Sequence, residues 1–306
     1  MALKVNNLTK IYGSQHAVDN LSFEVGKGQV LGFLGPNGAG KSTTMKMVSC
    51  YVSPTSGTAE VCGHDILESP LEARKHIGYL PEHNPLYLDM YVKEYLSFVA
   101  GLHRIKNKGA RIKDIIEMTG LDKESHKHIG ALSKGYRQRV GIAQAIMHDP
   151  DILILDEPTS GLDMNQLVEI RKLITELGKE KTVILSTHIM QEVEALCNRV
   201  IIINNGKLVA DDPIDRLQER MRGEQRVVIQ FMESSIDVTK LEAIPQVTSV
   251  LKEGEKFVLN TADNADIRAQ VFQTAVSQGW TLLEMKREEL NVEHIFQKLT
   301  TQNSYA

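Results

Sequence analysis

The 306-residue sequence has few cysteines, few aromatic residues and no long apolar run. Its three cysteines lie far apart and show no paired metal-ligand spacing, so we expect reduced thiols rather than a disulfide framework or a zinc module. No stretch approaches the ~18 consecutive apolar residues of a membrane-spanning helix. Residues 1–10 also lack the apolar core of a signal peptide. If the protein works at a membrane, we expect another chain to supply the spans.

An excess of positive charge is also missing, because 35 Lys and Arg stand against 39 Asp and Glu, a net charge of −4. This charge balance does not favour binding to nucleic acid, because such binding needs a basic face on the protein. The sequence contains no low-complexity stretch, heptad run or obvious internal repeat. Its composition is that of an ordinary globular protein, and its length suits about two domains.

The first part of the chain predicts an α/β domain. Apolar and polar residues alternate at Leu3 and Val5 and again from Leu21 to Val25, as in half-buried strands. Helical spacing begins at Lys41, and residues 89–148 are mostly helix-like. Four short apolar runs separated by glycine-rich or helical segments predict a largely parallel sheet; these runs are VLGFLG (30–35), ILILD (152–156), TVILST (182–187) and RVIIIN (199–204).

The character of the sequence changes around residues 222–225, which predicts a first domain over 1–222 and a second over 226–306. In the second part the expected order of elements is β-α-β-β-α-β, as in a ferredoxin-like α+β domain, followed by a last helix. The expected strands are 226–231, 247–252, 256–261 and 280–286, and the expected helices are 238–244, 265–278 and 291–300.

Residues 35–43, GPNGAGKST, have the pattern of a phosphate-binding loop. The glycines let the backbone approach phosphate oxygens, and the following helix N-terminus favours negative charge. Lys41 is expected to reach the β- and γ-phosphates, and the Ser42 hydroxyl to bind Mg²⁺. The residues predicted to bind the nucleotide through this loop are Gly35, Pro36, Asn37, Gly38, Ala39, Gly40, Lys41, Ser42 and Thr43.

Polar side chains follow two of the apolar runs. A carboxylate at the end of a parallel strand faces the ligand crevice, so Asp156 is expected to help fix Mg²⁺ and Glu157 to act as the base that polarises the attacking water. His188 follows the next run and is expected to donate a hydrogen bond to the γ-phosphate. Taken alone, the acids could instead begin a surface loop, and the histidine could be structural.

Together these motifs resemble those of the ABC (ATP-binding cassette) ATPases, over residues 1 to about 222. Tyr12 is similar to the aromatic residue that stacks on adenine in that family. The resemblance implies a P-loop cassette with a mixed-sheet core, an antiparallel β subdomain and a helical signature subdomain. The matching motifs are GPNGAGKST (Walker A), LSKGYRQRV (132–140, signature), ILILDE (152–157, Walker B), SGLD (160–163, D-loop) and STH (186–188, H-loop).

The resemblance also implies partners. Two such subunits form a head-to-tail homodimer, in which Ser133 and Gly135 of one chain contact ATP on the Walker A loop of the other and Asp163 lies near the nucleotide. Without the other motifs, LSKGY would be an ordinary N-capped helix. The implied cofactors are ATP and Mg²⁺. A separate transmembrane permease subunit, a peripheral cytoplasmic position at the inner face of the cell membrane and no nucleic acid are also implied.

Two motifs depart from the family pattern. Glu82 stands where the family usually has Gln, which keeps an oxygen for Mg²⁺ or the attacking water but adds a charge, so Glu82 is counted among the catalytic and metal-binding candidates. Lys134 and Tyr136 replace the usual Gly and Gln of the signature, whereas Ser133 and Gly135 remain. Both departures resemble the drug- and antibiotic-resistance branch of exporter ATPases.

Two segments show a narrower resemblance, to gliding-motility ATPase subunits of that branch: LSKGYRQRVGIAQA (132–145) and VEHIFQKLT (292–300). In such ATPases the segment after Glu82 accepts a short cytoplasmic helix of the membrane subunit. Residues 83–96, HNPLYLDMYVKEYL, therefore predict either a docking groove or core packing.

The function predicted from these residues is that of an ATP-hydrolysing subunit that dimerises around two ATP molecules and powers a separate membrane subunit, for export or gliding motility. One alternative is a soluble ABC protein acting on ribosomes or nucleic acid. Such proteins resemble two cassettes on one chain or a cassette split by a coiled coil, and this chain has one cassette and no heptads. A P-loop kinase is the other alternative, but it has no use for the signature and D-loop runs.

Overall fold

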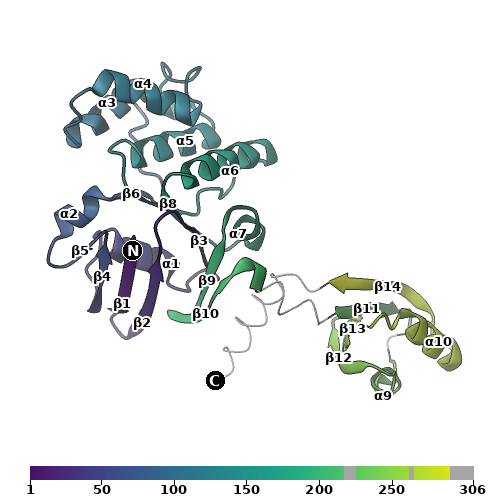
Figure 1. Ribbon diagram of the computed structural model, residues 1–306. Coiled ribbons are helices and arrows are strands. Elements are labelled where there is room, and N and C mark those ends of the chain that lie inside the picture. Colours follow the sequence, from purple (N-terminus) through teal and green to yellow (C-terminus); the bar gives the residue numbers. More distant parts are fainter. Residues whose placement is uncertain (217–224, 234, 262–264, 290–306) are drawn as a thin grey trace. The chain divides into compact units, whose positions relative to one another are not determined.

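The chain forms two compact units, Met1–Pro213 and Ile214–Ala306, in the computed structural model, which describes residues 1–216, 225–233, 235–261 and 265–289 (Figure 1). The last strand of the first unit is paired with its neighbour as far as Pro213. Residues 222–224, where the domain boundary is predicted, lie outside the described residues, so that boundary stays a prediction. Among the described residues, none of the helices combines the length and the apolar character that crossing a bilayer requires.

A four-stranded antiparallel sheet begins the first unit, with strand order β2-β1-β4-β5. Its alternating sequence buries Leu3 and Val5 on one face of β1, as the period-two pattern predicts. Leu8 is buried beyond an irregularity in the pairing of β1 with β2. The strands are β1 (Leu3–Tyr12), β2 (Gln15–Val25), β4 (Ser56–Val61) and β5 (His64–Asp65).

The second sheet of this unit has six strands in the order β10-β9-β3-β8-β7-β6. The five strands from β9 to β6 are parallel, and β10 pairs antiparallel with β9 through a tight turn between Asn204 and Lys207. The sheet is therefore mixed, as the family resemblance implies. Its strands are β3 (Val30–Leu34), β6 (Ile77–Leu80), β7 (Ile152–Asp156), β8 (Thr182–Thr187), β9 (Arg199–Asn204) and β10 (Lys207–Pro213).

Helices cover both faces of the central strands, which explains why β7 and β8 are buried along their whole length and have apolar centres, ILIL and VIL. Helix α1 (Lys41–Val48) contacts β2 of the first sheet and β7 and β8 of the second, so one core joins the two sheets. Helices α6 (Met164–Gly178) and α7 (Met190–Leu196) also pack against the six-stranded sheet.

The region predicted to be mostly helical forms a layer of three helices next to β6 and α6 (Figure 1). Helix α5 follows directly on Ser133, whose hydroxyl accepts a hydrogen bond from Tyr136 N at 3.4 Å. This is the N-cap geometry expected for a Ser before a helix. The helices are α3 (Val92–Leu102), α4 (Lys108–Thr119) and α5 (Lys134–Ala145); a short helix, α2 (Pro70–Lys75), lies before β6.

Within its described residues, the second unit has an antiparallel sheet with strand order β12-β13-β11-β14 and two helices, in the chain order β-α-β-β-α-β. Its first and third strands occupy the centre, which is the ferredoxin-like arrangement predicted from the sequence. Helix α10 starts three residues later than expected from 265–278, after Ile267, and the expected helix 291–300 lies outside the described residues. The elements are β11 (Gln225–Phe231), α9 (Val238–Glu242), β12 (Val247–Glu253), β13 (Lys256–Thr261), α10 (Arg268–Gln278) and β14 (Leu282–Glu289).

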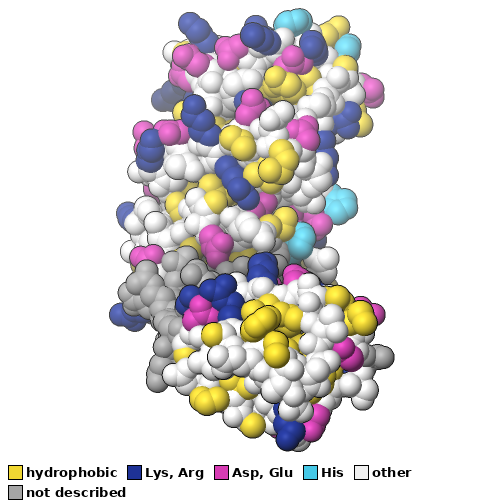
Figure 2. All heavy atoms as spheres, turned by 90° about the vertical axis from the view of Figure 1, so that its right-hand side faces the viewer, with side chains coloured by type: hydrophobic (Ala, Val, Ile, Leu, Met, Phe, Trp, Pro, Cys, Tyr) yellow, Lys and Arg dark blue, Asp and Glu magenta, His cyan; other side chains and the backbone are white. Residues whose placement is uncertain are grey.

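This unit has a core of its own, in which Val227, Ile229 and Phe231 of β11 pack with Val271 and Ala275 of α10. Other apolar side chains of the unit remain at the surface. Figure 2 shows apolar side chains gathered among polar and charged ones on the face it presents. On α10 the exposed large apolar side chains are Phe272 and Val276.

Candidate nucleotide-binding site

The predicted phosphate-binding loop runs from the end of β3 into α1 and is shaped by two glycines. Gly40 has φ 102°, and a Cβ on it would lie 2.3 Å from the carbonyl oxygen of Ala17. A Cβ on Gly35 would lie 2.6 Å from the carbonyl oxygen of Ile203. Both positions therefore exclude any side chain, and the loop closes tightly over the first turn of α1.

Lys41 is the first residue of α1, and its buried ammonium lies over the loop. Its Nζ donates hydrogen bonds to Gly35 O at 2.8 Å and Pro36 O at 3.2 Å, and it is 3.7 Å from Glu157 Oε1. Burial lowers the pKa of Lys41, while the carboxylates of Glu157 and Asp156 oppose that shift. A phosphate bound in the loop would add negative charge close to this cation.

Asp156 ends β7 and is buried, as the apolar run before it requires. Its Oδ1 accepts a hydrogen bond from Ser186 Oγ at 2.7 Å, whereas its buried Oδ2 has no hydrogen-bond partner among the described residues. Burial raises the pKa of Asp156, and the bond from Ser186 opposes this. An unpartnered buried carboxylate oxygen is costly unless a ligand completes it. It therefore fits a hard cation that binds oxygen. Ser42 and Glu82 line the same cavity of about 410 Å³ as Asp156.

Glu157 follows Asp156 in a left-handed conformation, with φ 51°, which costs about 1–2 kcal/mol for a residue other than glycine. Its N–H donates to Ser186 O at 2.8 Å, which holds the turn against β8. Its two carboxylate oxygens each lie 2.9 Å from His188 Nδ1. Burial raises the pKa of Glu157, whereas His188 and Lys41 lower it. The carboxylate is thus held between a cation and an imidazole at the mouth of the loop.

The phosphate-binding loop, Glu157 and His188 open onto one cleft of about 590 Å³ in the first unit. The cleft brings together most of the candidates predicted from the sequence, including Tyr12, which is half-exposed at the end of β1 with Lys10 Nζ 5.2 Å from its ring centroid. The residues that line it are Tyr12, Gln15, Ala17, Asn37, Gly38, Gly40, Lys41, Ser42, Thr43, Glu82, Glu157, Ser160 and His188.

Seven predicted residues do not line this cleft. Gly35, Pro36 and Ala39 belong to the loop itself, and Asp156 lines the second cavity, which shares Ser42 and Glu82 with the cleft. The other three are Ser133, Gly135 and Asp163. They lie together elsewhere on the first unit, around Gln166 of α6. Asp163 Oδ1 caps α6 by accepting from Gln166 N at 2.9 Å, and Gln166 Nε2 is 3.5 Å from Ser133 Oγ. A Cβ on Gly135 would lie 2.7 Å from the Gln166 side chain. The signature and the D-loop of one chain therefore contact each other, while Ser133 and Asp163 remain exposed.

Sequence reasoning missed a buried connection behind the cleft. Glu192 of α7 is fully buried, and its carboxyl group accepts hydrogen bonds from the hydroxyls of Thr159 and, at 2.8 Å, Thr187. Thr159 follows Glu157 closely in the chain, and Thr187 precedes His188. The sequence did not indicate this role for Glu192, because a glutamate on a short polar helix is usually expected at the surface. Gln15 and Ala17 at the rim were also missed, and only their proximity to Tyr12 could have indicated them.

Comparisons with known proteins agree with this geometry. A family model described as "ABC transporter" matches residues 18–160. The bacitracin transport ATP-binding protein BcrA of Bacillus licheniformis is 36% identical, over 97% of this chain and 96% of that protein. The linearmycin resistance ATP-binding protein LnrL of Bacillus subtilis (strain 168) is 34% identical, over 97% and 98%. The Nod factor export ATP-binding protein I of Burkholderia lata is 32% identical, over 96% and 95%.

Two solved structures resemble the first unit in fold. The ATP-binding subunit of an ABC transporter superposes with a TM-score of 0.65 at 28% identity, covering 72% of this chain and 93% of that one. A dimeric bacterial ABC transporter cassette superposes with a TM-score of 0.63 at 25% identity, covering 69% of this chain and 98% of that one.

Proposed function

The chain belongs to the ABC transporter family, as a subunit that binds and hydrolyses ATP, and we propose that Glu157 is the general base of that hydrolysis. The observation that carries the proposal is the position of its buried carboxylate, 2.9 Å from His188 Nδ1 and 3.7 Å from Lys41 Nζ in the nucleotide cleft. There it would accept the proton of the attacking water, while Lys41 holds the β- and γ-phosphates. His188 orients the carboxylate and would donate to the γ-phosphate as charge develops.

A Mg²⁺ ion fits beside this base. Asp156 Oδ2 is buried and has no hydrogen-bond partner in the part of the chain that the structure describes, and the Ser42 hydroxyl and the Glu82 carboxylate line the same cavity. These three residues would hold the ion through oxygen atoms, the ligands that Mg²⁺ prefers. When bound, it supplies positive charge that stabilises the phosphate oxygens. Glu82, in place of the usual Gln, adds a further negative charge to the ion's surroundings.

The active form in our proposal is a head-to-tail dimer. Ser133, Gly135 and Asp163 are absent from the chain's own cleft, which supports a role for them on the nucleotide of the partner. Ser133 and the first turn of α5 would present a helix N-terminus to the γ-phosphate, where the helix dipole favours negative charge. Tyr12, exposed at the cleft rim, would stack on adenine.

The proposed role of the dimer is to drive export through a separate membrane-spanning permease, from the inner face of the cell membrane. The three relatives above are a transport, a resistance and an export protein, and each aligns with nearly the whole chain. In the segment proposed to accept the permease, the side chains of Tyr87, Leu88 and Tyr91 are about half exposed. With no basic excess and such relatives, a role on ribosomes or nucleic acid is not favoured, and the gliding-motility resemblance stays a prediction.

Substitution of Glu157 by Gln tests this function. The amide can still hydrogen-bond water but cannot take its proton, and loss of a general base costs about 10²- to 10⁴-fold in rate. We expect turnover to fall by that factor, ATP binding to persist, and ATP with Mg²⁺ to trap a dimer on gel filtration. Glu176→Gln, at an exposed position of α6, is the matched control. Wild-type turnover in the Glu157→Gln protein would refute the assignment.

A further inference from the structure

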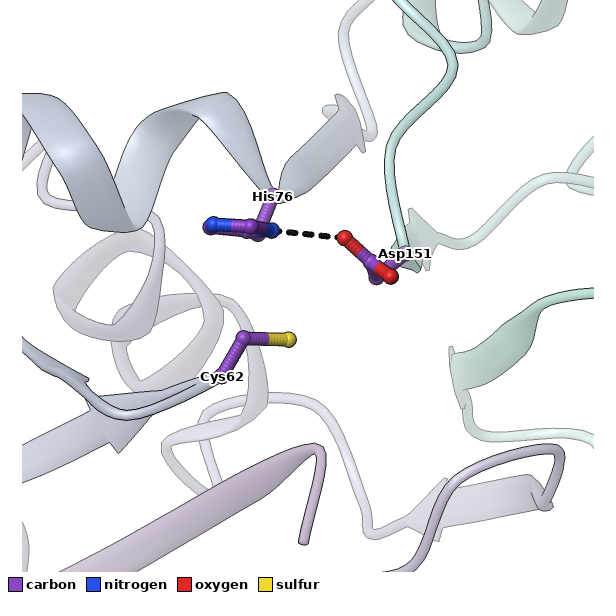
Figure 3. Close-up of side chains that lie close together, drawn as sticks. All are labelled: Cys62, His76 and Asp151. Carbon is purple, nitrogen blue, oxygen red and sulfur yellow. Dashed lines mark hydrogen bonds and ion pairs between the residues drawn. The ribbon is translucent and has the colours of Figure 1, made fainter.

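Three potential metal ligands meet on the first unit outside the nucleotide cleft. The Sγ atom of Cys62, a ring nitrogen of His76 and a carboxylate oxygen of Asp151 all lie within 4.8 Å of one another. Figure 3 shows the three side chains converging on one space, with the thiol of Cys62 directed toward it. Asp151 directly precedes β7, whose opposite end is Asp156. Five residue-to-residue steps of extended chain separate the two, or roughly 16 Å, so this cluster is distinct from the nucleotide site.

Backbone hydrogen bonds fix all three residues. Cys62 and Gly63 form the two-residue turn between β4 and β5, with φ 49° and 89°, as a tight hairpin requires. Cys62 N also donates to Ala2 O at 2.8 Å. His76 caps the end of α2, and its carbonyl accepts from Ile152 N at 2.9 Å, next to Asp151. The sequence alone does not indicate this site, because the three residues lie at positions 62, 76 and 151 and show no metal-ligand spacing.

We propose that Cys62, His76 and Asp151 form a binding site for a divalent zinc-type metal ion, with solvent as the fourth ligand. Thiolate, imidazole and carboxylate are the donor types that zinc takes in tetrahedral sites, whereas Mg²⁺ and Ca²⁺ prefer oxygen alone. One thiolate and one carboxylate would balance the charge of the ion. The thiol releases its proton to solvent as the ion binds.

The present contacts prepare the site for an ion. His76 Nδ1 lies 2.6 Å from Asp151 Oδ2, so a nitrogen and an oxygen already face each other and need only turn toward the metal. The His64 ring stacks on the His76 ring with centroids 5.3 Å apart and limits its rotation. The side chain of Asp151 is 55% exposed and that of His76 32%, so an ion can enter without opening the core. Once bound, it would tie together the β4–β5 turn, the end of α2 and the start of β7.

Cobalt(II) is the probe, because a cobalt–thiolate bond gives an intense charge-transfer absorption that an oxygen site cannot give. The full chain, reduced and free of any affinity tag, is titrated with Co²⁺ in excess Mg²⁺, and Zn²⁺ is then added as competitor. We expect the absorption to appear and Zn²⁺ to abolish it. Cys62→Ser should remove the absorption. His76→Ala and Asp151→Asn should each weaken binding by at least about tenfold, since even residues that only support a ligand cost 10- to 100-fold.

Cys50→Ser is the matched control, because Cys50 is another partly buried free thiol of the same unit and is no member of the cluster. This variant should bind Co²⁺ like the wild type. Circular dichroism of each variant checks that it folds. If His76→Ala does not fold, Asp151→Asn, at the most exposed ligand, provides the test instead. Wild-type protein without the charge-transfer absorption would overturn the proposal, as would absorption that persists in Cys62→Ser. The three residues would then form an ordinary surface ion pair beside a thiol.

Discussion

At the residue scale, the catalytic assignments depend on how burial and neighbouring charges act on a few groups. Burial raises the pKa values of Asp156 and Glu157 and lowers that of Lys41, so each charge is maintained by its partners rather than by water. Asp156 and Glu157 could be found from the sequence because Asp156 ends an apolar strand and Glu157 follows it directly. The contact of Glu157 with His188 was not, since it joins residues 31 positions apart.

Tyr12 tests the adenine contact. Stacking of a base on an aromatic ring is worth about 1–3 kcal/mol. Tyr12→Ala should therefore weaken ATP binding by that amount, while Tyr12→Phe, which keeps the ring, should bind like the wild type. Calorimetric titration with ATP measures both. Equal losses in the two variants would point instead to a contact of the hydroxyl.

His148 tests the effect of burial on a histidine away from the cleft. Burial lowers its pKa to about 4, and the His103 ring stacks on it with centroids 4.1 Å apart. In the unfolded chain the pKa is about 6.5, so the unfolded state binds the proton more tightly. The free energy of unfolding should therefore decrease as the pH falls from about 6.5 to about 4.

Replacement of His148 by Gln should make this decrease smaller, as measured by denaturant unfolding at several pH values. His126→Gln, at an exposed position, is the control and should keep the wild-type slope. The idea fails if the slopes of the His148→Gln protein and the wild type coincide between these pH values.

At the element scale, the strands with continuous apolar sequence were predictable, and the shortest elements were not. Strands β3, β7, β8 and β9 follow from continuous apolar sequence between glycine-rich or helical segments. Strands β4 and β5 and helix α2 were not predicted; β5 has two residues and α2 has six. Strand β6 has only four residues, and one of them is Gly78, where a Cβ would lie 2.3 Å from Ala145 O. That glycine serves the packing of α5 on the sheet, which no local pattern reveals.

Glu192 connects the loops that carry Glu157 and His188, and we expect it to position them. Glu192→Ala would leave the hydroxyls of Thr159 and Thr187 buried without their acceptor, at about 1–3 kcal/mol for each. Turnover should fall while the KM for ATP changes little, and Glu192→Gln, which keeps one acceptor, should recover part of it. Steady-state kinetics separate the two effects. Glu194→Ala, at an exposed position of the same helix, should be unaffected; an equal loss there would contradict the positioning role.

At the scale of the whole molecule, the two units have separate cores, and all catalytic candidates lie in the first. A chain that ends at Arg222 should therefore remain folded and bind ATP as the full chain does. The truncation should reduce transport, or assembly with the permease, more than basal ATP hydrolysis. The reason is that the second unit contributes no catalytic residue and exposes Phe272 and Val276 for contact. Nucleotide titration and transport assays of the two proteins compare these effects. Loss of ATP binding by a folded truncated chain would contradict this division.

The most direct test of the account mixes two inactive chains, Lys41→Ala and Ser133→Arg. In a head-to-tail heterodimer one composite site carries both lesions and the other carries neither, because Lys41 acts in its own cleft and Ser133 in that of the partner. We predict that ATP hydrolysis by the mixture exceeds that of either variant alone at the same total concentration. If mixing restores nothing while both variants are folded and form dimers, both residues serve one chain's own site and the account is wrong.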